Sequence, residues 1–109
     1  MTDDALNDLN ELGRFSDPSL LILASLAGGP KHGYSMMEDI EQISGTRLGP
    51  GTLYGALARL ERRGLIEPLP AEERRRPYRI TGVGATALRE QLRSLETFAA
   101  TGLGRLATL

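Results

Sequence analysis

The sequence predicts a mainly helical fold with one small β-hairpin in its second half. Apolar residues recur at helical spacing in four segments before residue 64 and again after residue 83. Two short extended segments, 65–69 and 76–81, flank a charged turn, which is typical of a hairpin. The 109 residues have the length of a single domain.

The first two helices are predicted at 2–12 and from residue 17 onward. In 2–12, leucine recurs every three residues behind an acidic start. Asp17 is a typical N-cap, and Pro18 suits the first turn that follows it. Because 20–26 is apolar on nearly all sides, we expect the second helix to be buried.

Two further helices are predicted at 33–43 and 49–63. The apolar positions of the first of these are Met36, Ile40 and Ile43. The second has two different faces when its residues are placed about 100° apart. Its apolar side holds Leu53, Ala56, Leu57 and Leu60, and its outward side holds Thr52, Gly55, Arg59 and Arg63.

The hairpin and a long helix complete the chain. The charged hairpin tip is predicted at 70–75, and Pro77 implies that its strand lies at a sheet edge. The last helix, 83–106, has an apolar stripe with alternating spacings of four and three. The stripe consists of Leu88, Leu92, Leu95, Ala99, Gly102 and Leu106.

The order of these elements is that of a winged helix-turn-helix. In that fold, the last of three closely joined helices reads DNA, and the hairpin forms the wing. We therefore predict an N-terminal helix at 1–15 that packs on a dimer partner. The winged helix-turn-helix DNA-binding domain follows at 16–82, and a C-terminal dimerisation helix at 83–109.

Composition excludes several kinds of site. The chain has no Cys and one His, so we expect neither disulfides nor a thiolate or His-rich metal site. No apolar run approaches the ~20 residues of a membrane span, and the acidic start does not resemble a signal peptide. We therefore expect a cytoplasmic protein that is not an enzyme and binds no membrane, metal or cofactor.

The charges are unevenly distributed, although the net charge is only −1. Residues 47–79 contain eight Arg and four Glu, whereas the first twelve residues contain four acidic side chains and no cation. Arg favours bidentate contact with phosphate or guanine, so the basic segment indicates a nucleic-acid partner. The alternatives are solvated arginines on an ordinary surface helix and a solubilising charged turn at 74–76.

Two other motifs have a functional and a structural interpretation. Residues 82–87 fit the dinucleotide fingerprint G-x-G-x-x-A, which would indicate a small nucleotide-dependent enzyme. That fingerprint needs a βαβ unit, and the 22 residues that follow are predicted to be helical. We therefore expect these glycines to ease the turn into the last helix, and His32 to form a structural hydrogen bond rather than act in catalysis.

The apolar stripe of the last helix must be buried against something. The preceding domain has enough helices to close its own core, so the expected partner is a second copy of the chain. The alternative is packing back on the same domain. The predicted interface residues are Leu6, Leu9, Leu88, Leu92, Leu95, Ala99 and Leu106.

Several motifs of the chain resemble those of PadR-type transcriptional regulators. The resemblance rests on 21–23 and 29–34, on 47–61 with its core Pro50-Gly51-Thr52-Leu53-Tyr54, and on 64–66, 75–81 and Gly84. Gly49 and Gly55 depart from the residues common in that family. These two departures bear on affinity rather than on fold.

The resemblance implies a homodimeric winged-helix repressor of a palindromic operator in double-stranded DNA. It also implies release by a small-molecule or stress signal, with Tyr54 on DNA and the wing arginines on the DNA backbone. The predicted DNA contacts are Lys31, His32, Tyr34, Pro50, Gly51, Thr52, Tyr54, Arg59, Arg63, Arg74, Arg75, Arg76 and Tyr78. The alternative function is a winged-helix protein-interaction module that binds no DNA.

Overall fold

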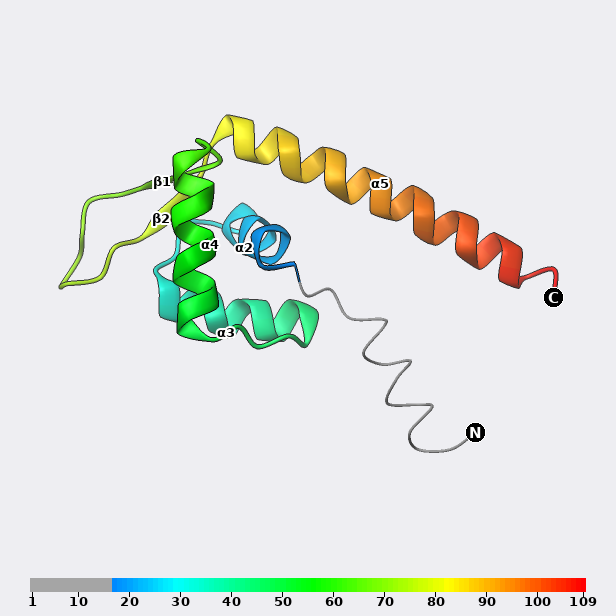
Figure 1. Ribbon diagram of the computed structural model, residues 1–109, viewed down its shortest axis with the longest axis horizontal. Coiled ribbons are helices and arrows are strands. Elements are labelled where there is room, and N and C mark those ends of the chain that lie inside the picture. Colours follow the sequence, from blue (N-terminus) through cyan, green and yellow to red (C-terminus); the bar gives the residue numbers. More distant parts are fainter. Residues whose placement is uncertain (1–16) are drawn as a thin grey trace.

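The computed structural model describes residues 17–109, which form four helices and one two-stranded hairpin (Figure 1). The elements are α2 (Pro18–Ala27), α3 (Gly33–Ser44), α4 (Pro50–Arg62), β1 (Ile66–Pro68), β2 (Tyr78–Ile80) and α5 (Gly82–Leu106). Most of α5 extends away from the small domain that the other elements form. The predicted winged helix-turn-helix fold is confirmed, and the helix predicted at 2–12 lies outside the described residues.

Local caps determine where the helices begin and end. Asp17 caps α2, because the backbone N–H of Ser19 donates to its Oδ1 over 3.0 Å. Gly45 ends α3 with a φ of 74°, a left-handed conformation that favours glycine. Thr81 caps α5, because the backbone N–H of Gly84 donates to its Oγ1 over 3.0 Å. Helix α5 therefore begins one residue earlier than predicted.

The core lies between α2, α3 and α4 and is closed by β1 and the start of α5. Its largest fully buried side chains are Ile22, Leu26, Met36, Ile40, Leu53, Leu57, Ile66 and Ser25. One core prediction is wrong, because Ile43 is 55% exposed and Met37 is buried instead. Ile43 lies in the last turn of α3, at the end of that helix that points away from α4 (Figure 1).

The hairpin is antiparallel, with Ile66 opposite Ile80. Each strand has three residues and is shorter than the segments predicted at 65–69 and 76–81. On the other side of β2, the backbones of Lys31 and Tyr78 pair through two N–H to carbonyl hydrogen bonds of 3.2 and 2.9 Å. In this two-stranded sheet β2 lies at an edge, as Pro77 led us to predict, and the isolated bridge to Lys31 covers that edge at Tyr78 alone.

Helix α5 packs on the domain through its first two turns. Gly84 and Leu88 are buried there, whereas most side chains beyond them are exposed. A Cβ added at Gly84 would lie 2.0 Å from the carbonyl oxygen of Leu65, so glycine is needed for this close approach. Leu88, a predicted dimer-interface residue, is buried in the core of its own domain, so the described chain leaves little of its side chain open to a partner.

Candidate nucleic-acid interface

One surface of the domain combines the start of α3, the exposed side of α4 and the wing. An open cavity of about 420 Å³ lies between these elements, and it is lined by His32, Gly33, Tyr34, Tyr54, Arg74, Arg75, Arg76 and Tyr78. All of these except Gly33 are predicted DNA contacts. The fold therefore brings together residues that lie far apart in the sequence.

Helix α4 has the two faces that the sequence predicts. Its buried side holds Leu53, Ala56, Leu57 and Leu60, and its exposed side holds Thr52, Gly55, Arg59 and, directly after the helix, Arg63. Pro50 and Gly51 begin the helix and are exposed as well. Gly49 supplies no side-chain cap, so backbone N–H groups of the first turn remain for solvent or for a phosphate.

Three tyrosines line this cavity. Tyr54 is 53% exposed, and the end of its phenol ring lies against Gly33 at the start of α3. Tyr34 is exposed to a similar degree, whereas Tyr78 is half-buried. Burial raises the pKa of the Tyr78 hydroxyl, and the nearby carboxylate of Glu61 raises it further. Tyr78 is therefore a neutral hydrogen-bond donor at neutral pH.

The wing tip is a tight turn made of unusual residues. The backbone N–H groups of Glu72 and Arg75 each donate to the carbonyl of the other over 2.7 Å. Between them, Glu73 and Arg74 have φ values of 45° and 71°, a conformation usually taken by Asn and Gly in such turns. Strained backbone of this kind is typical of functional segments. Arg74 thus lies at the tip itself.

The three wing arginines have different partners. Arg75 Nη1 lies 3.3 Å from His32 Nε2, and Arg76 Nη1 donates to the carbonyl oxygen of Leu69 over 3.0 Å. Arg74 forms no hydrogen bond or ion pair with any residue in the range 17–109. All three side chains are exposed, and none has a carboxylate partner within the described chain.

Lys31, a predicted DNA contact, also has a structural role. Its Nζ donates to the carbonyl oxygens of Ser25 and Gly29 over 2.6 and 3.2 Å. It also lies 3.9 Å from Oδ2 of Asp39, which accepts a hydrogen bond of 2.7 Å from the buried Ser25 Oγ. The ammonium group is therefore held between α2 and α3, and its contact with DNA stays a prediction.

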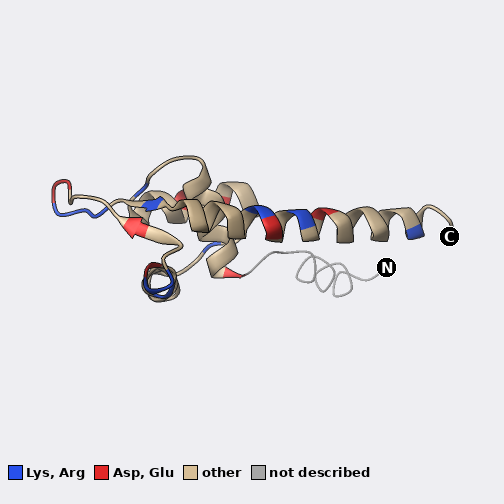
Figure 2. Ribbon diagram, turned by 90° about the horizontal axis from the view of Figure 1, so that it is seen from above, with Lys and Arg blue, Asp and Glu red and all other residues tan. Residues whose placement is uncertain are grey.

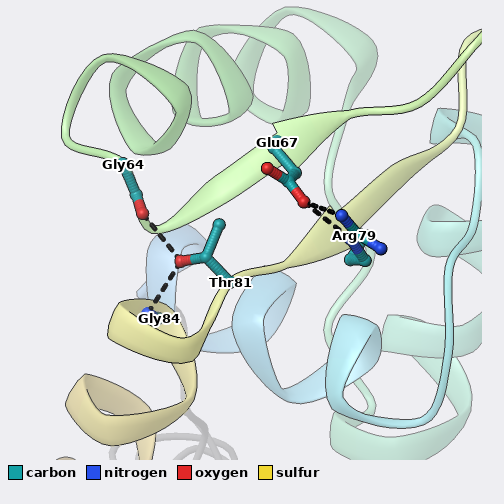
Figure 3. A network of polar contacts seen from close by, with 5 residues as sticks. All are labelled: Gly64, Glu67, Arg79, Thr81 and Gly84. Carbon is teal, nitrogen blue, oxygen red and sulfur yellow. Dashed lines mark hydrogen bonds and ion pairs between the residues drawn. The ribbon is translucent and has the colours of Figure 1, made fainter.

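Arginine outnumbers glutamate by three to two at the wing tip, 72–76, and by three to one at 50–63, so both have a net positive charge. Figure 2 shows that the basic positions of α4 and the wing lie at the end of the molecule opposite the carboxyl end of α5. Between the strands, Arg79 Nε donates to Glu67 Oε1 over 2.7 Å (Figure 3). That ion pair neutralises Arg79, so the charge open to a polyanion is concentrated at the wing tip and on α4.

A second open cavity, of about 410 Å³, lies where α2 and β2 meet α5. It is lined by Ala27, Ile80, Ala85, Leu88, Arg89, Leu92, Arg93 and Glu96. The apolar stripe of α5 is largely open to solvent: Leu92, at the cavity, is 46% exposed, and Leu106, beyond it, is 62% exposed. Phe98 and Leu103 are also exposed. They were not among the predicted interface residues, because each is next in sequence to a stripe position and not itself part of the alternating spacing of four and three.

The glycine motif at 82–87 does not have the surroundings of a dinucleotide fingerprint. It follows an antiparallel hairpin and begins α5, so it is not part of a βαβ unit. Residues 17–109 contain no cluster of three or more metal-ligating side chains. Over the same range, no helix combines the length and the apolar character that crossing a membrane requires.

Residues 22–90 match the family model of the transcriptional regulator PadR-like family. A protein of a Streptomyces fradiae transposon is 49% identical over 82 residues, which cover 75% of this chain and 24% of that protein. This chain thus spans about a quarter of that relative's length. The transcriptional regulator Rv3488 of Mycobacterium tuberculosis is 41% identical over 91 residues, which cover 78% of this chain and 81% of that protein.

Two solved structures share the fold. A transcriptional regulator from Clostridium thermocellum has a TM-score of 0.68 and 31% identity, covering 76% of this chain and 86% of that one. A PadR family transcription regulator from Clostridium difficile has a TM-score of 0.70 and 25% identity, covering 77% and 92%. Since the family, the mycobacterial relative and both structures are transcriptional regulators, the prediction that the chain is not an enzyme is confirmed. The chain belongs to the PadR-like family of transcriptional regulators, which act by binding DNA.

Proposed function

We propose that this chain is a sequence-specific DNA-binding repressor that acts as a homodimer. The observation that carries the proposal is the joint surface of α4 and the wing, where seven predicted DNA contacts line one cavity. The tip arginines there are exposed and not ion-paired, and the polar side of α4 is exposed beside them. Double-stranded DNA fits both features, because it is a polyanion whose major groove admits a helix.

The proposed contacts divide into those with phosphates and those with bases. Arg74, Arg75 and Arg76 contact phosphates, because exposed guanidinium groups on a hairpin suit a charged backbone. Thr52 and Arg59 lie on the exposed side of α4 and reach base edges in the major groove. The further contacts that we propose are His32, Tyr34, Pro50, Gly51, Tyr54, Arg63 and Tyr78.

The dimer forms through α5 in this proposal. One recognition helix offers few base contacts, and specific binding usually needs two half-sites about one helical turn apart. Helix α5 is about 37 Å long at 1.5 Å per residue, and its apolar stripe is open beyond the second turn. The interface would contain Leu92, Leu95, Ala99 and Leu106. Leu6 and Leu9, which lie outside the described residues, would cover the stripe from the partner chain.

The chain then consists of three parts: 1–15 on the dimer partner, the DNA-binding domain at 16–82 and the dimerisation helix at 83–109. The cavity of about 410 Å³ lies where the second part meets the third. A small molecule bound there would change the angle between the two parts. We propose that such a signal releases the repressor from a palindromic operator in the cytoplasm.

Selection of bound DNA from a random duplex pool tests this function. A recovered palindrome with half-sites about ten base pairs apart would support both DNA reading and two-fold symmetry. Recovery of a single, asymmetric site would retain DNA binding and contradict the homodimer. Recovery of no preferred sequence would contradict the repressor and favour a winged-helix protein-interaction module.

A further inference from the structure

Gly33 and Tyr54 are closer together than any side chain at position 33 would allow. Gly33 is the first residue of α3, and Tyr54 lies in the second turn of α4. A Cβ added at Gly33 would stand 2.4 Å from Tyr54 Oη, 2.9 Å from Cζ and 3.2 Å from Cε1. Real Cβ atoms essentially never approach other atoms within 3.0 Å. The phenol group therefore occupies the space that a side chain at position 33 would fill.

The backbone does not require glycine at position 33. The glycines with positive φ among the described residues are Gly29, Gly45 and Gly64. Gly33 has the conformation of a helical residue, which alanine adopts readily. Gly33 is buried, with the phenol of Tyr54 lying directly over it. What the missing side chain provides at this position is room for Tyr54.

The contact with Gly33 determines where the tyrosine ring lies. Tyr54 is 53% exposed, so much of its ring faces solvent rather than packed protein. Its hydroxyl forms no hydrogen bond with residues 17–109. The ring nevertheless lies in the cavity between α4 and the wing, together with His32 and Arg75. Packing against the start of α3 is therefore what holds it there.

We propose that Gly33 is a positioning residue for DNA recognition, because its missing side chain lets Tyr54 lie across the start of α3 and present its hydroxyl to DNA from a fixed direction. This inference rests on the proposed DNA-binding function. A methyl group at position 33 would displace the phenol by about 1 Å, the difference between 2.4 Å and ordinary contact at 3.4 Å. Because the phenol ends a rotatable and exposed side chain, the ring moves and the domain stays folded.

A double-mutant cycle of Gly33→Ala and Tyr54→Ala tests the proposal. The matched control is Gly82→Ala, since Gly82 is the first residue of α5 and has nothing within 4 Å of an added Cβ. Affinity is measured by fluorescence anisotropy on the duplex recovered from the random pool, and thermal unfolding is followed for each protein. Gly33→Ala should bind about five- to tenfold more weakly, the size of one lost hydrogen bond, and the control should bind normally.

The double variant decides how Gly33 acts. In the Tyr54→Ala background, Gly33→Ala should leave affinity unchanged, and any loss of thermal stability caused by Gly33→Ala should disappear. An equal loss of affinity in both backgrounds would overturn the inference, because Gly33 would then act without the tyrosine. Normal affinity of Tyr54→Ala would also overturn it while leaving DNA binding intact. Absence of specific DNA binding by the unchanged protein would instead overturn the proposed function itself.

Discussion

Thr81 Oγ1 donates a hydrogen bond of 2.7 Å to the carbonyl oxygen of Gly64 (Figure 3). Gly64 follows α4, and Thr81 is the N-cap of α5, so one hydroxyl group connects the ends of these two helices. Thr81 Oγ1 also accepts a hydrogen bond of 3.0 Å from the backbone N–H of Gly84. In the dimer that we propose, this joint sets the angle between recognition helix and dimer helix, and thereby the distance between two recognition helices.

Thr81→Val should lower the free energy of unfolding by about 1–2 kcal/mol. It keeps the shape of the side chain but removes both the cap of α5 and the bond to Gly64. Urea denaturation measures the change. Thr86→Val, at an exposed position of the same helix, is the control and should have an effect below about 0.5 kcal/mol. Equal stabilities of the two variants would contradict the role assigned to Thr81.

Replacing Arg74, Arg75 and Arg76 together with Ala should weaken binding to every DNA sequence alike. Each neutralised phosphate contributes about −0.9 to the slope of log affinity against log salt, so the slope should flatten by up to ~3. Titrations at several salt concentrations measure it. Arg105→Ala, in the last turn of α5, should leave the slope unchanged. An unaltered slope in the triple variant would show that the wing arginines do not contact phosphates.

Thr52→Ala and Arg59→Ala should each weaken binding at particular base pairs. Both side chains lie on the exposed side of α4, where contacts with base edges contribute about 1–3 kcal/mol of discrimination. Affinities for a set of operators, each with one base pair changed, measure this effect. If either variant binds all of these operators more weakly by the same factor, that residue contacts the backbone instead.

Leu92→Asp should give monomers or unfolded chain. In the proposed dimer it buries two unpaired carboxylates, each of which costs on the order of several kcal/mol. Light scattering measures the mass, and a gel shift measures operator binding, which should be lost while weak non-specific binding remains in any folded fraction. Ser94→Asp, at an exposed position off the apolar stripe, should remain dimeric. A dimeric Leu92→Asp protein with normal operator binding would place the interface elsewhere.

Lys31→Met should lower stability without changing the salt dependence of DNA binding. The ammonium group donates to the carbonyls of Ser25 and Gly29 and lies near Asp39, so its removal leaves acceptors without their donor. The expected loss is about 1–3 kcal/mol in urea denaturation. A stable variant with a flatter salt slope would instead show that Lys31 contacts phosphate.

The start of α2 and the end of α3 could be predicted because they depend on neighbouring residues. Asp17 caps the turn that directly follows it, and Gly45 ends α3 through its own backbone conformation. The two faces of α4 follow from a regular spacing within one helix, so its exposed side could be predicted as well. Helix caps and helical spacing can both be recognised within a short stretch of sequence.

The remaining features depend on contacts between distant parts of the chain. The pairing of Lys31 with Tyr78, which adds a bridge to the sheet, has no local pattern. The apolar stripe has the same spacing at Leu88 and Leu92, but only the packed fold shows that α5 leaves the domain between them. Gly33 belongs to the candidate site because of where Tyr54 lies, and the sequence does not show that contact.

The turn at Glu73 and Arg74 has a consequence for anyone who engineers this protein. Two side chains in the left-handed conformation each destabilise the hairpin by about 1 kcal/mol or more, and Asn-Gly would form the same turn without that strain. A screen for heat-resistant variants would therefore favour replacements at these two positions. In the function that we propose, the same replacements remove a guanidinium group from the wing tip, so selection for a more stable wing acts against affinity for DNA.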